Sequence, residues 1–543
     1  MEKINLEKII KYILGLSIVY FSFLPIVSVL ISGFNKYIIS KNNMDVLIRP
    51  IIHLKNSLLI SITVTILATS IGFIISFTLN RLEFKFRKDL KKLAFLPLIN
   101  PPFVGSIAFI MLFGKRGLIS HQLLNLNISP FGSHGIIIIE TISFSALAYI
   151  IMSSSIKNVD ISLENAARSL GSSEIKIFKT ITLPLMIPEI SSAALLVFLA
   201  SMADFITPLI IGGSFQTLAS DLYIQITGLY DLPSASLSGV ILLFPCIIVF
   251  LLQRYYLKPK SFFSDNIQSK DIEYKNIPKL LKYIFISITV MYLFFVSFKY
   301  IFIIIGAFTK QWGYNYTLTL MHVKKALGNR FFKPFINSIQ LALVVALISS
   351  IVGVVLSYLL SKSQSKINTI IDFLGVIPAA IPGILFGIGY LITFKYPLFY
   401  FTSITLLGTN VIIYIISIFR YLNVGLRTGY SLIEHINPEL ENAAYNLGAS
   451  KIKTFITITI PLLKEAFYNA FYKNFSTTMT TLGAIIFLLL PSNKVAVQQI
   501  FQMITSSSIG VAAIMSLILS LITLIFLLFF NFIFKIRKDS LWK

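Results

Sequence analysis

The chain has 543 residues, of which 56% are hydrophobic and 13% are charged, and its mean hydropathy is +0.83. A soluble globular domain cannot cover so apolar a composition with an ordinary polar surface, so the class that fits is a polytopic membrane protein. The formal net charge of +24 does not indicate nucleic-acid binding, because the Lys and Arg residues stand in short clusters beside the apolar runs.

Long apolar runs occur from one end of the chain to the other, and a helical run of about 20 residues can cross about 30 Å of hydrocarbon. We therefore predict an all-α polytopic membrane protein with about twelve transmembrane helices. Six of these spans are expected at 10–33, 56–79, 93–113, 134–156, 187–211 and 236–255. The other six are expected at 279–305, 337–360, 369–394, 402–423, 464–490 and 510–534.

The basic clusters beside the spans predict the orientation of the chain. The stretch RLEFKFRKDLKK runs from Arg81 to Lys92, and a second basic stretch runs from Arg254 to Lys282. Lys and Arg concentrate on the cytoplasmic side of membrane proteins. The N-terminal run MEKINLEKIIK is followed by no small-residue cleavage site, so we expect a retained first span rather than a removed signal peptide. With an even number of spans, both termini are then expected to be cytoplasmic.

The sequence repeats itself, and the repeat predicts two halves of six spans each. The matching features are offset by 281 positions: Asn56-Ser57 and Asn337-Ser338, Pro97 and Pro378, and Pro101 and Pro382. We expect a first repeat at 1–255, a cytoplasmic linker at 256–278 and a second repeat at 279–543. Because each half holds an even number of spans, both halves enter the membrane from the same side, as two parallel repeats.

A second block repeats with an offset of 277 positions. LENAARSLGSSEIKIFKTITLPL, from Leu163 to Leu185, matches LENAAYNLGASKIKTFITITIPL, from Leu440 to Leu462, at about 16 of 23 positions. The copies lie between spans four and five and between spans ten and eleven, on the predicted cytoplasmic side. Chance similarity of two apolar helices does not explain the match, because the block is amphipathic and partly polar.

Each copy of this block is predicted to fold as a short helix, a tight turn and a second helix. Asp160 and Asn437 are placed to cap the first helix of their copies. Gly171 and Gly448 supply the permissive backbone that ends this helix and begins the next. A pair of alanines keeps one side of the first helix narrow, so that the helix can lie in a groove of another protein.

The pattern E-N-A-A-x-x-L-G, followed by a proline, resembles the EAA coupling loop of the permeases of ABC importers. In that family the short helix docks into a cleft of a cytoplasmic ATPase subunit and carries ATP-driven closure to the spans. The resemblance implies the permease fold (ABC transmembrane type-1) for both repeats. It also implies an ATPase-coupling role for Glu164, Ala166, Ala167, Gly171, Glu441, Ala443, Ala444 and Gly448.

The resemblance extends over nearly the whole chain. In detail, the sequence is similar to the fused permeases of the ferric-iron importer group. It rests on the stretches SMADFITPLIIGGSFQTLASDLYIQI at 201–226, IPAAIPGILFGIGY at 377–390 and TTMTTLGAIIFLLLP at 477–491. Fused permeases for thiamine, phosphonate, polyamine or another small solute have similar sequences, so these cargoes stay open beside ferric iron. The resemblance implies the bacterial cytoplasmic (inner) membrane as the location.

Polar residues in the fifth span of each repeat are the candidates for the route of the cargo. The expected lining residues, which correspond in pairs at the 277 offset, are Ser201, Asp204, Thr478 and Thr481. Ionisable groups inside a membrane are costly and tend to face a polar interior. The alternative is that these groups hydrogen-bond neighbouring helices, and the sequence does not separate the two. Glu140 and Lys473 are further candidates for charges within the spans.

The sequence contains no phosphate-binding loop of the form G-x-x-x-x-G-K-[S/T], so ATP and Mg²⁺ are expected on a partner ATPase, and this chain is not expected to be an enzyme. The five histidines have no paired ligand spacing and the single cysteine, Cys246, lies in an apolar run, so neither a metal site nor a bound cofactor is expected. The resemblance implies two copies of an ATP-binding cassette subunit and an extracytoplasmic solute-binding protein as partners. Membrane lipid surrounds the chain, and no nucleic acid is expected.

A secondary transporter with two six-span halves is the alternative from a different class. The major-facilitator kind would carry a Gly-Asp-Arg-Gly-Arg type signature between spans two and three, where this chain reads NRLEFKFRKDLKK. A non-transporting membrane scaffold would need neither proline-broken spans nor polar residues within them. We therefore predict the permease of an ABC importer.

Overall fold

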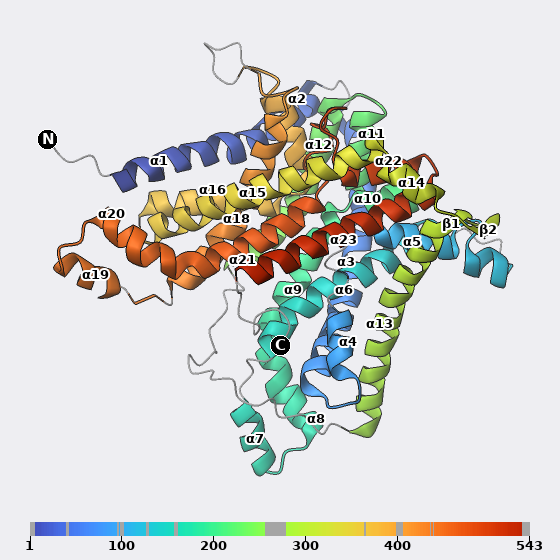
Figure 1. The fold of residues 1–543 in the computed structure, drawn as a ribbon, viewed down its shortest axis with the longest axis horizontal. Coiled ribbons are helices and arrows are strands. Elements are labelled where there is room, and N and C mark those ends of the chain that lie inside the picture. Colours follow the sequence, from blue (N-terminus) through green and yellow to red (C-terminus); the bar gives the residue numbers. More distant parts are fainter. Residues whose placement is uncertain are drawn as a thin grey trace. The chain divides into compact units, whose positions relative to one another are not determined.

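The structure is a computed structural model that describes residues 6–39, 43–94, 97, 103–125, 130–156, 161–255, 278–362, 365–397, 405–434, 436–437 and 439–534 (Figure 1). The expected linker at 256–278 lies outside these residues except for Pro278, and so do Pro101 and Asp160. The chain forms two compact units. Unit 1 contains residues 1–39, 327–500 and 518–543, and unit 2 contains residues 40–326 and 501–517.

Unit 2 is helical except for one antiparallel pair of short strands among the described residues. Its elements are α3 (Asn43–Arg81), α4 (Arg87–Leu93), α5 (Val104–Phe113), the π-helical turn η3 (Leu118–Leu123), α6 (Ser133–Ile156), α7 (Ile161–Ser169), α8 (Glu174–Ile177), the π-helical turn η4 (Phe178–Thr182), α9 (Leu183–Ala203), α10 (Ile206–Ile211), α11 (Leu218–Thr227), α12 (Leu232–Tyr255), α13 (Lys279–Phe308), β1 (Thr309–Gln311), β2 (Asn315–Leu318) and α14 (Met321–Leu327).

Unit 1 is built from helices alone in its described part. Its elements are α1 (Leu6–Ile18), the π-helical turn η1 (Val19–Phe23), α2 (Leu24–Ile39), α15 (Asn329–Ser361), α16 (Lys366–Ala380), α17 (Gly383–Thr393), α18 (Val411–Ile433), α19 (Glu439–Asn446), α20 (Lys451–Thr454), the π-helical turn η5 (Phe455–Thr459) and α21 (Ile460–Met479). Two further helices, α22 (Ala496–Thr505) and α23 (Ile509–Ile533), contribute residues to both units.

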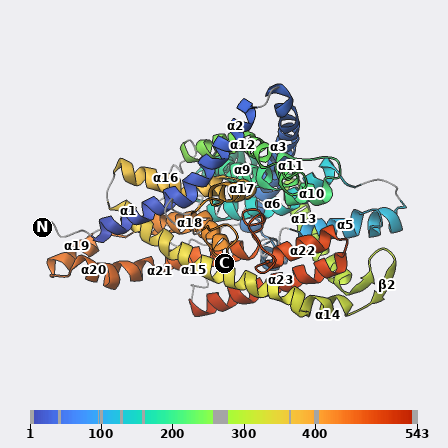
Figure 2. The same cartoon turned by 90° about the horizontal axis from the view of Figure 1, so that it is seen from above.

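The compact units differ from the sequence repeats in the placement of the first helix of each repeat. The N-terminal helices belong to unit 1, where α1 packs on α15 and α16, and α2 packs on α17 (Figure 2). The hydroxyl of Tyr390 holds this packing by donating to the carbonyl of Phe21 at 2.7 Å. Conversely, α13 packs on α3 and α5 of unit 2, and Tyr292 donates to the carbonyl of Ile142 at 3.0 Å. Each compact unit therefore combines its own helices with a first helix from the other repeat.

Nine helices in the described part of the chain are long and apolar enough to cross a membrane, or ten if the bent pair α16 and α17 counts as one span. Two of the twelve expected spans are missing from this set. The third corresponds to α5, which begins only at Val104. The eleventh corresponds to α21, which ends at Met479 rather than near residue 490 and carries Lys464, Glu465 and Lys473. Hydropathy extended this span too far, because the apolar residues after Met479 form turns instead of helix.

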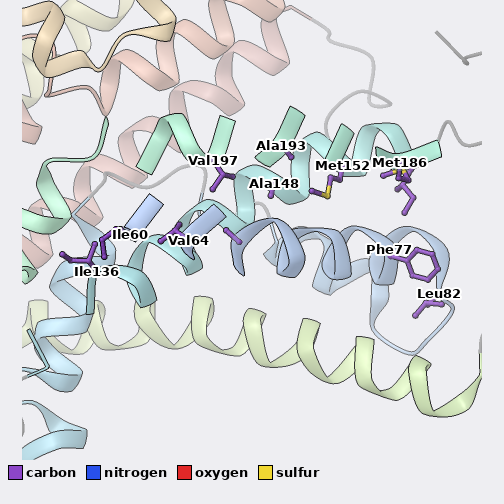
Figure 3. Packing of buried hydrophobic residues seen from close by; sticks show 12 residues of the cluster. Ile60, Val64, Phe77, Leu82, Ile136, Ala148, Met152, Met186, Ala193 and Val197 are labelled. Atoms are coloured by element: carbon purple, nitrogen blue, oxygen red, sulfur yellow. The ribbon is translucent and has the colours of Figure 1, made fainter. Parts of the chain in front are cut away.

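Side-chain packing holds the long helices of unit 2 together. Figure 3 shows a buried cluster to which α3 contributes Ile60 and Val64, α6 contributes Ile136 and Ala148, and α9 contributes Ala193 and Val197. In lipid the hydrophobic effect does not drive helices together, so close fit and small residues at the crossings supply the association energy.

One close crossing of long helices has the same position in both units. A Cβ on Gly72 of α3 would lie 2.6 Å from the Cβ of Ala148 on α6. At the 281 offset, a Cβ on Gly353 of α15 would lie 2.7 Å from the Cα of Gly425 on α18. The small residue at each of these positions is thus a requirement of the repeated fold.

The Asn-Ser pair that marked the repeat also has one structural role in both units. Ser57 accepts a hydrogen bond from the first backbone N–H of α11 at 2.8 Å, and Ser338 does the same for α22 at 2.8 Å. Asn56 donates to the carbonyl of Gln216 at 2.9 Å, and Asn337 donates to the carbonyl of Lys494 at 2.8 Å. Each pair fastens the start of a short helix to a long one.

We expect Gly353→Val to destabilise the purified protein by about 1–3 kcal/mol, because the added side chain meets backbone atoms of α18 that cannot move aside cheaply. Thermal unfolding in detergent micelles measures this loss. Val344→Leu on the exposed face of α15 is the matched control and should leave the unfolding temperature unchanged. Equal stability of Gly353→Val and the control would contradict the packing argument.

Candidate functional site

The first repeated block folds as predicted into a helix, a turn and a second helix, formed by α7 and α8. Gly171 lies between them with a φ of +78°, a conformation that L side chains rarely adopt. The N–H of Ser172 donates to the carbonyl of Ala167 at 3.0 Å, and the N–H of Gly171 donates to that of Arg168 at 3.0 Å. These two bonds form a Schellman motif, which satisfies the last carbonyls of the helix and stops it.

The second block repeats this geometry bond for bond in α19 and α20. Gly448 has a φ of +79°. The N–H of Ala449 donates to the carbonyl of Ala444 at 3.0 Å, and the N–H of Gly448 donates to that of Tyr445 at 2.9 Å. Asn437 caps the helix as expected, since its Oδ1 accepts from the N–H of Glu439 at 2.9 Å. In Figure 1 each helix pair lies at one end of the long helices of its own unit.

The glutamate of the first block points into unit 2 instead of toward solvent. The Glu164 carboxylate is 2% exposed and accepts a hydrogen bond from Thr182 Oγ1 at 2.6 Å. Its other oxygen lies 3.7 Å from Nη1 of Arg81, which is equally buried. Arg81 is the last residue of α3, and Thr182 directly precedes α9, so one carboxylate ties α7 to the ends of two long helices.

The glutamate of the second block makes the corresponding contacts in unit 1. Glu441 accepts hydrogen bonds from Thr459 and from the Tyr358 hydroxyl, both at 2.9 Å. Its second oxygen lies 3.2 Å from Nζ of Lys362. Thr459 precedes α21, and Lys362 directly follows α15, so α19 is tied to two long helices in the same way.

These partners of the glutamates were missed from the sequence, although the repeat itself holds a signal for them. Thr182 and Thr459 correspond at the 277 offset, and Arg81 and Lys362 correspond at the 281 offset. A basic residue at the end of the second span in both repeats could have been matched with the acid in the coupling block. Nothing in local spacing shows that they touch, because 83 and 79 residues separate the members of the two ion pairs.

The opposite face of each short helix is apolar and exposed. Leu170 is 86% exposed and Leu447, its counterpart, is 89% exposed. The other exposed residues of this face are Leu163 and Ala166 on α7 and Leu440 and Ala443 on α19. We call these two sets of three residues the apolar stripes. Ala444 turns inward and is buried, whereas Ala167 is half-buried, so only one alanine of each pair lies on the stripe.

The predicted route residues of the first repeat gather around a polar cavity of about 280 Å³ in unit 2. Asp204 and Glu140 line it, and Ser201 donates a hydrogen bond to Oε2 of Glu140. Asp204 follows the end of α9 and accepts from the N–H of Ile206 at 2.9 Å and from the hydroxyl of Thr207 at 2.6 Å. The carboxylate of Asp204 thus caps α10, which is a structural role beside its place in the cavity wall.

The corresponding residues of the second repeat lie in unit 1. Thr478 is buried near the end of α21, and Thr481 follows that helix, with its N–H bonded to the carbonyl of Thr478 at 3.2 Å. Lys473 is exposed on α21. The position equivalent to Glu140 is Ser417, whose one hydrogen bond within the described part of the chain is to its own helix, at the carbonyl of Ile413.

Among the described residues, no group of three or more His, Cys, Asp or Glu side chains is arranged to hold a metal ion. His53 contacts the carbonyl of Gln216 at 3.2 Å, and His322 contacts the carbonyl of Thr309 at 3.0 Å. Both imidazoles are therefore engaged with backbone within their own unit.

Two repeats of membrane-crossing helices, each with a capped helix pair tethered to its spans, define a duplicated multi-pass membrane permease. A family model described as binding-protein-dependent transport system inner membrane component matches residues 68–262 and 349–538. The chain belongs to this family of ABC transporter permease subunits, which lack an ATPase site of their own and operate with a solute-binding protein.

Similar proteins cover most of the chain. The ferric transport system permease protein FbpB of Actinobacillus pleuropneumoniae is 29% identical over 88% of this chain and 71% of its own length. A putative ferric transport system permease protein FbpB 1 of Haemophilus influenzae is 29% identical over 81% of this chain and 70% of its own length. The molybdenum transport system permease protein ModB of Mycobacterium bovis is 31% identical over 30% of this chain and 63% of its own length.

We call the bonds of Glu164 and Glu441 to the ends of the long helices the tethers of α7 and α19. The stability that the Glu441 tether gives to α19 should decrease as the pH falls. Partial burial acts to raise the pKa of Glu441, but hydrogen bonds from Thr459 and Tyr358 and the charge of Lys362 outweigh it, so the pKa lies below its usual value. A carboxyl whose pKa is lowered by folding contributes stability that is complete above the unfolded pKa of about 4.3 and is lost as the pH falls through the folded-state pKa.

Hydrogen exchange of the α19 amides, corrected for the intrinsic rate at each pH, measures this effect. We expect constant protection from about pH 7 to 5 and a decline below about pH 4. In Glu441→Gln the amides should exchange faster at neutral pH, with little further change on acidification. If the Gln variant kept wild-type protection and the same acid transition, the assignment of the tether to the Glu441 carboxylate would be wrong.

Proposed function

We propose that this chain is the permease of an ATP-driven importer of ferric iron in the bacterial cytoplasmic membrane. The two FbpB proteins support ferric iron as the cargo, because each is similar over more than two thirds of its own length. Molybdenum and spermidine/putrescine permeases match shorter parts of the chain. The family supports the importer assignment whichever of these cargoes is correct, so the identity of the cargo needs a test of its own.

One observation carries the mechanism: each repeat presents an exposed apolar stripe on a helix whose other face is fixed to the spans by a carboxylate. Several apolar side chains exposed together on one face of a short helix form a patch of the kind that marks a protein–protein interaction site. We assign that surface to two ATPase subunits, one for each stripe, with ATP and Mg²⁺ bound on those subunits. The residues in the coupling role are Glu164, Ala166, Ala167, Gly171, Glu441, Ala443, Ala444 and Gly448.

The tethers explain how force would pass from the ATPase to the spans. ATP binding draws the two ATPase subunits together and moves α7 and α19 with them. Because Glu164 is bonded to the ends of α3 and α9, and Glu441 to the ends of α15 and α21, a displacement of the short helix moves the long ones. The halves then rock between inward-facing and outward-facing states, and hydrolysis resets the cycle.

The orientation follows from the positive-inside pattern. Both termini and both helix pairs are assigned to the cytoplasm, and the loops at 213–236 and 492–509 are assigned to the outside, where the solute-binding protein delivers the cargo. The Asn-Ser pairs that fasten α11 and α22 would give this delivery surface a fixed geometry. The route through the membrane is assigned to Ser201, Asp204, Thr478 and Thr481.

Uptake of radiolabelled ferric iron into cells tests the cargo. The chain is co-expressed with the ATPase and the binding protein encoded beside it, and uptake is compared with cells that lack only this chain. We expect loss of iron uptake on deletion and restoration by the intact chain. Unchanged uptake would overturn ferric iron as the cargo while leaving the importer assignment, and thiamine, phosphonate, polyamine and molybdate would be assayed next.

Substitutions on the apolar stripes test the coupling surface. Leu170→Asp and Leu447→Asp place a charge on the docking face without touching the tethers, so each should reduce uptake at least about tenfold, since one buried charge costs more than 1.4 kcal/mol of binding. The amount of permease in the membrane should stay at the wild-type level.

Phe86→Asp is the matched control, because Phe86 is 65% exposed and lies on the same predicted side of the membrane, between α3 and α4. Its uptake should equal that of the wild type. Co-purification of the ATPase with the permease gives a second readout. Full uptake and full co-purification in the Leu170→Asp, Leu447→Asp double variant would show that the apolar stripes are not the surface that couples the permease to the ATPase.

A further inference from the structure

The polar cavity of unit 2 contains a buried carboxylate oxygen that the described residues leave without a hydrogen bond. Glu140 of α6 is 1% exposed. Its Oε2 accepts from Ser201, whereas its Oε1 has no partner among the described residues. A buried carboxylate oxygen that receives no hydrogen bond from the described protein groups is costly unless an occupant of the cavity supplies the missing contact. This oxygen is therefore a candidate to bind a ligand in the cavity.

The other carboxylate of the cavity is already satisfied. Both oxygens of Asp204 are occupied by Ile206 and Thr207, which fix the start of α10. The two acids that line the cavity therefore differ in availability. Glu140 has a free oxygen to offer to a ligand, and Asp204 adds negative charge without needing to move.

The second repeat shows that the fold itself does not require this acid. The close crossings at Gly72 and Gly353 align α6 with α18, and this alignment places Ser417 where Glu140 stands. Ser417 is buried and satisfied by the carbonyl of Ile413 at 2.7 Å. The same helix pairing thus forms with a small neutral residue, so the charge of Glu140 is not a packing requirement.

One cationic side chain, Lys299 of α13, also lines the cavity. Lys299 is buried, and within the described part of the chain its ammonium forms no ion pair at contact distance; its Nζ lies 5.4 Å from the centre of the Tyr300 ring. An ammonium in a membrane interior needs compensating negative charge nearby. When all three groups are ionised, the two carboxylates and the one ammonium leave the cavity wall with one excess negative charge.

We propose that the polar cavity is a low-affinity cation site of the transport route, in which Glu140 is the ligand and Lys299 is a built-in competitor that keeps binding weak. The carboxylate of Glu140 and the hydroxyl oxygens of Ser143 and Thr207 suit a hard, hydrated cation, and Asp204 adds negative charge beside them. Two carboxylates are too few for a tight metal centre. A binding site along a transport route must hold the ion strongly enough to admit it and weakly enough to release it. That the ion transported is ferric iron rests on the proposed function; the presence of the site does not.

Binding of Tb³⁺ to the full chain in lipid nanodiscs tests this site without transport. Tb³⁺ is a hard, redox-inert trivalent cation, and its luminescence decay in H₂O and D₂O reports how many waters it keeps. We expect one component with few bound waters, from the buried cavity, beside fast components from surface carboxylates. Glu140→Gln should remove this component or weaken its affinity about ten- to hundredfold.

Lys299→Met gives the decisive sign, because a residue with only a packing role would not tighten cation binding when its charge is removed. We expect the affinity of the water-poor component to rise at least about tenfold in this variant. Glu83→Gln, which removes an exposed carboxylate from the same unit, is the matched control and should leave the component unchanged.

The proposal is overturned if the water-poor component is absent from the wild type or persists unchanged in Glu140→Gln. Where Glu140→Gln fails to fold, an unchanged affinity in Lys299→Met overturns it as well. Tb³⁺ binding that follows the expected pattern in a chain that imports no iron would support the site and refute ferric iron as the cargo, so the two failures are distinguishable.

Discussion

A carboxylate on a short helix, bonded to the ends of two long helices, is the interaction on which the working parts of both units depend. Helices as short as α7 and α19 are unstable in isolation, because nucleation costs more than a few hydrogen bonds return. The Schellman turns stop these helices, but they do not attach them to anything. Glu164 and Glu441 supply the attachment, and without them the exposed stripes would have no rigid base.

The two tethers reach the same end by different chemistry. Glu164 is fully buried beside Arg81, whose planar guanidinium is weakly hydrated and suits a buried site. Glu441 is partly exposed and pairs with Lys362, with a further bond from Tyr358 in the place that Phe77 occupies in the first repeat. Removing one partner of a buried ion pair costs much folding free energy, because the other charge is left buried and unpaired. In a partly exposed pair, water screens the remaining charge and the cost is smaller. Removing one partner should therefore cost more stability in the first repeat than in the second.

The sequence predicted the features that depend on local chemistry or on repetition. The helix pairs, the glycine turns and the cap at Asn437 follow from short-range backbone rules, and the Asn-Ser pairs stood out because they occur twice. The sequence did not predict the early end of α21, since hydropathy measures only how apolar a stretch is. The exchange of α1 and α13 between repeats, and the bonds from Glu164 to Arg81, are contacts between distant parts of the chain that no local pattern encodes.

Duplication allows the two repeats to keep one scaffold while their interiors diverge. Where the first repeat has Ser143 in the wall of the polar cavity, the second has Arg420. Arg420 donates to the carbonyls of Pro378 and Ile381 at 3.1 and 3.2 Å, where the chain bends by 113° between α16 and α17. Its charge is therefore occupied with carbonyls that the end of α16 leaves free. One repeat thus has an acid whose second oxygen receives no hydrogen bond among the described residues, and the other has a base bound to its own backbone, so the two halves differ in charge where the proposed cation site lies. Two identical subunits could not achieve this inequality, whereas a fused chain can.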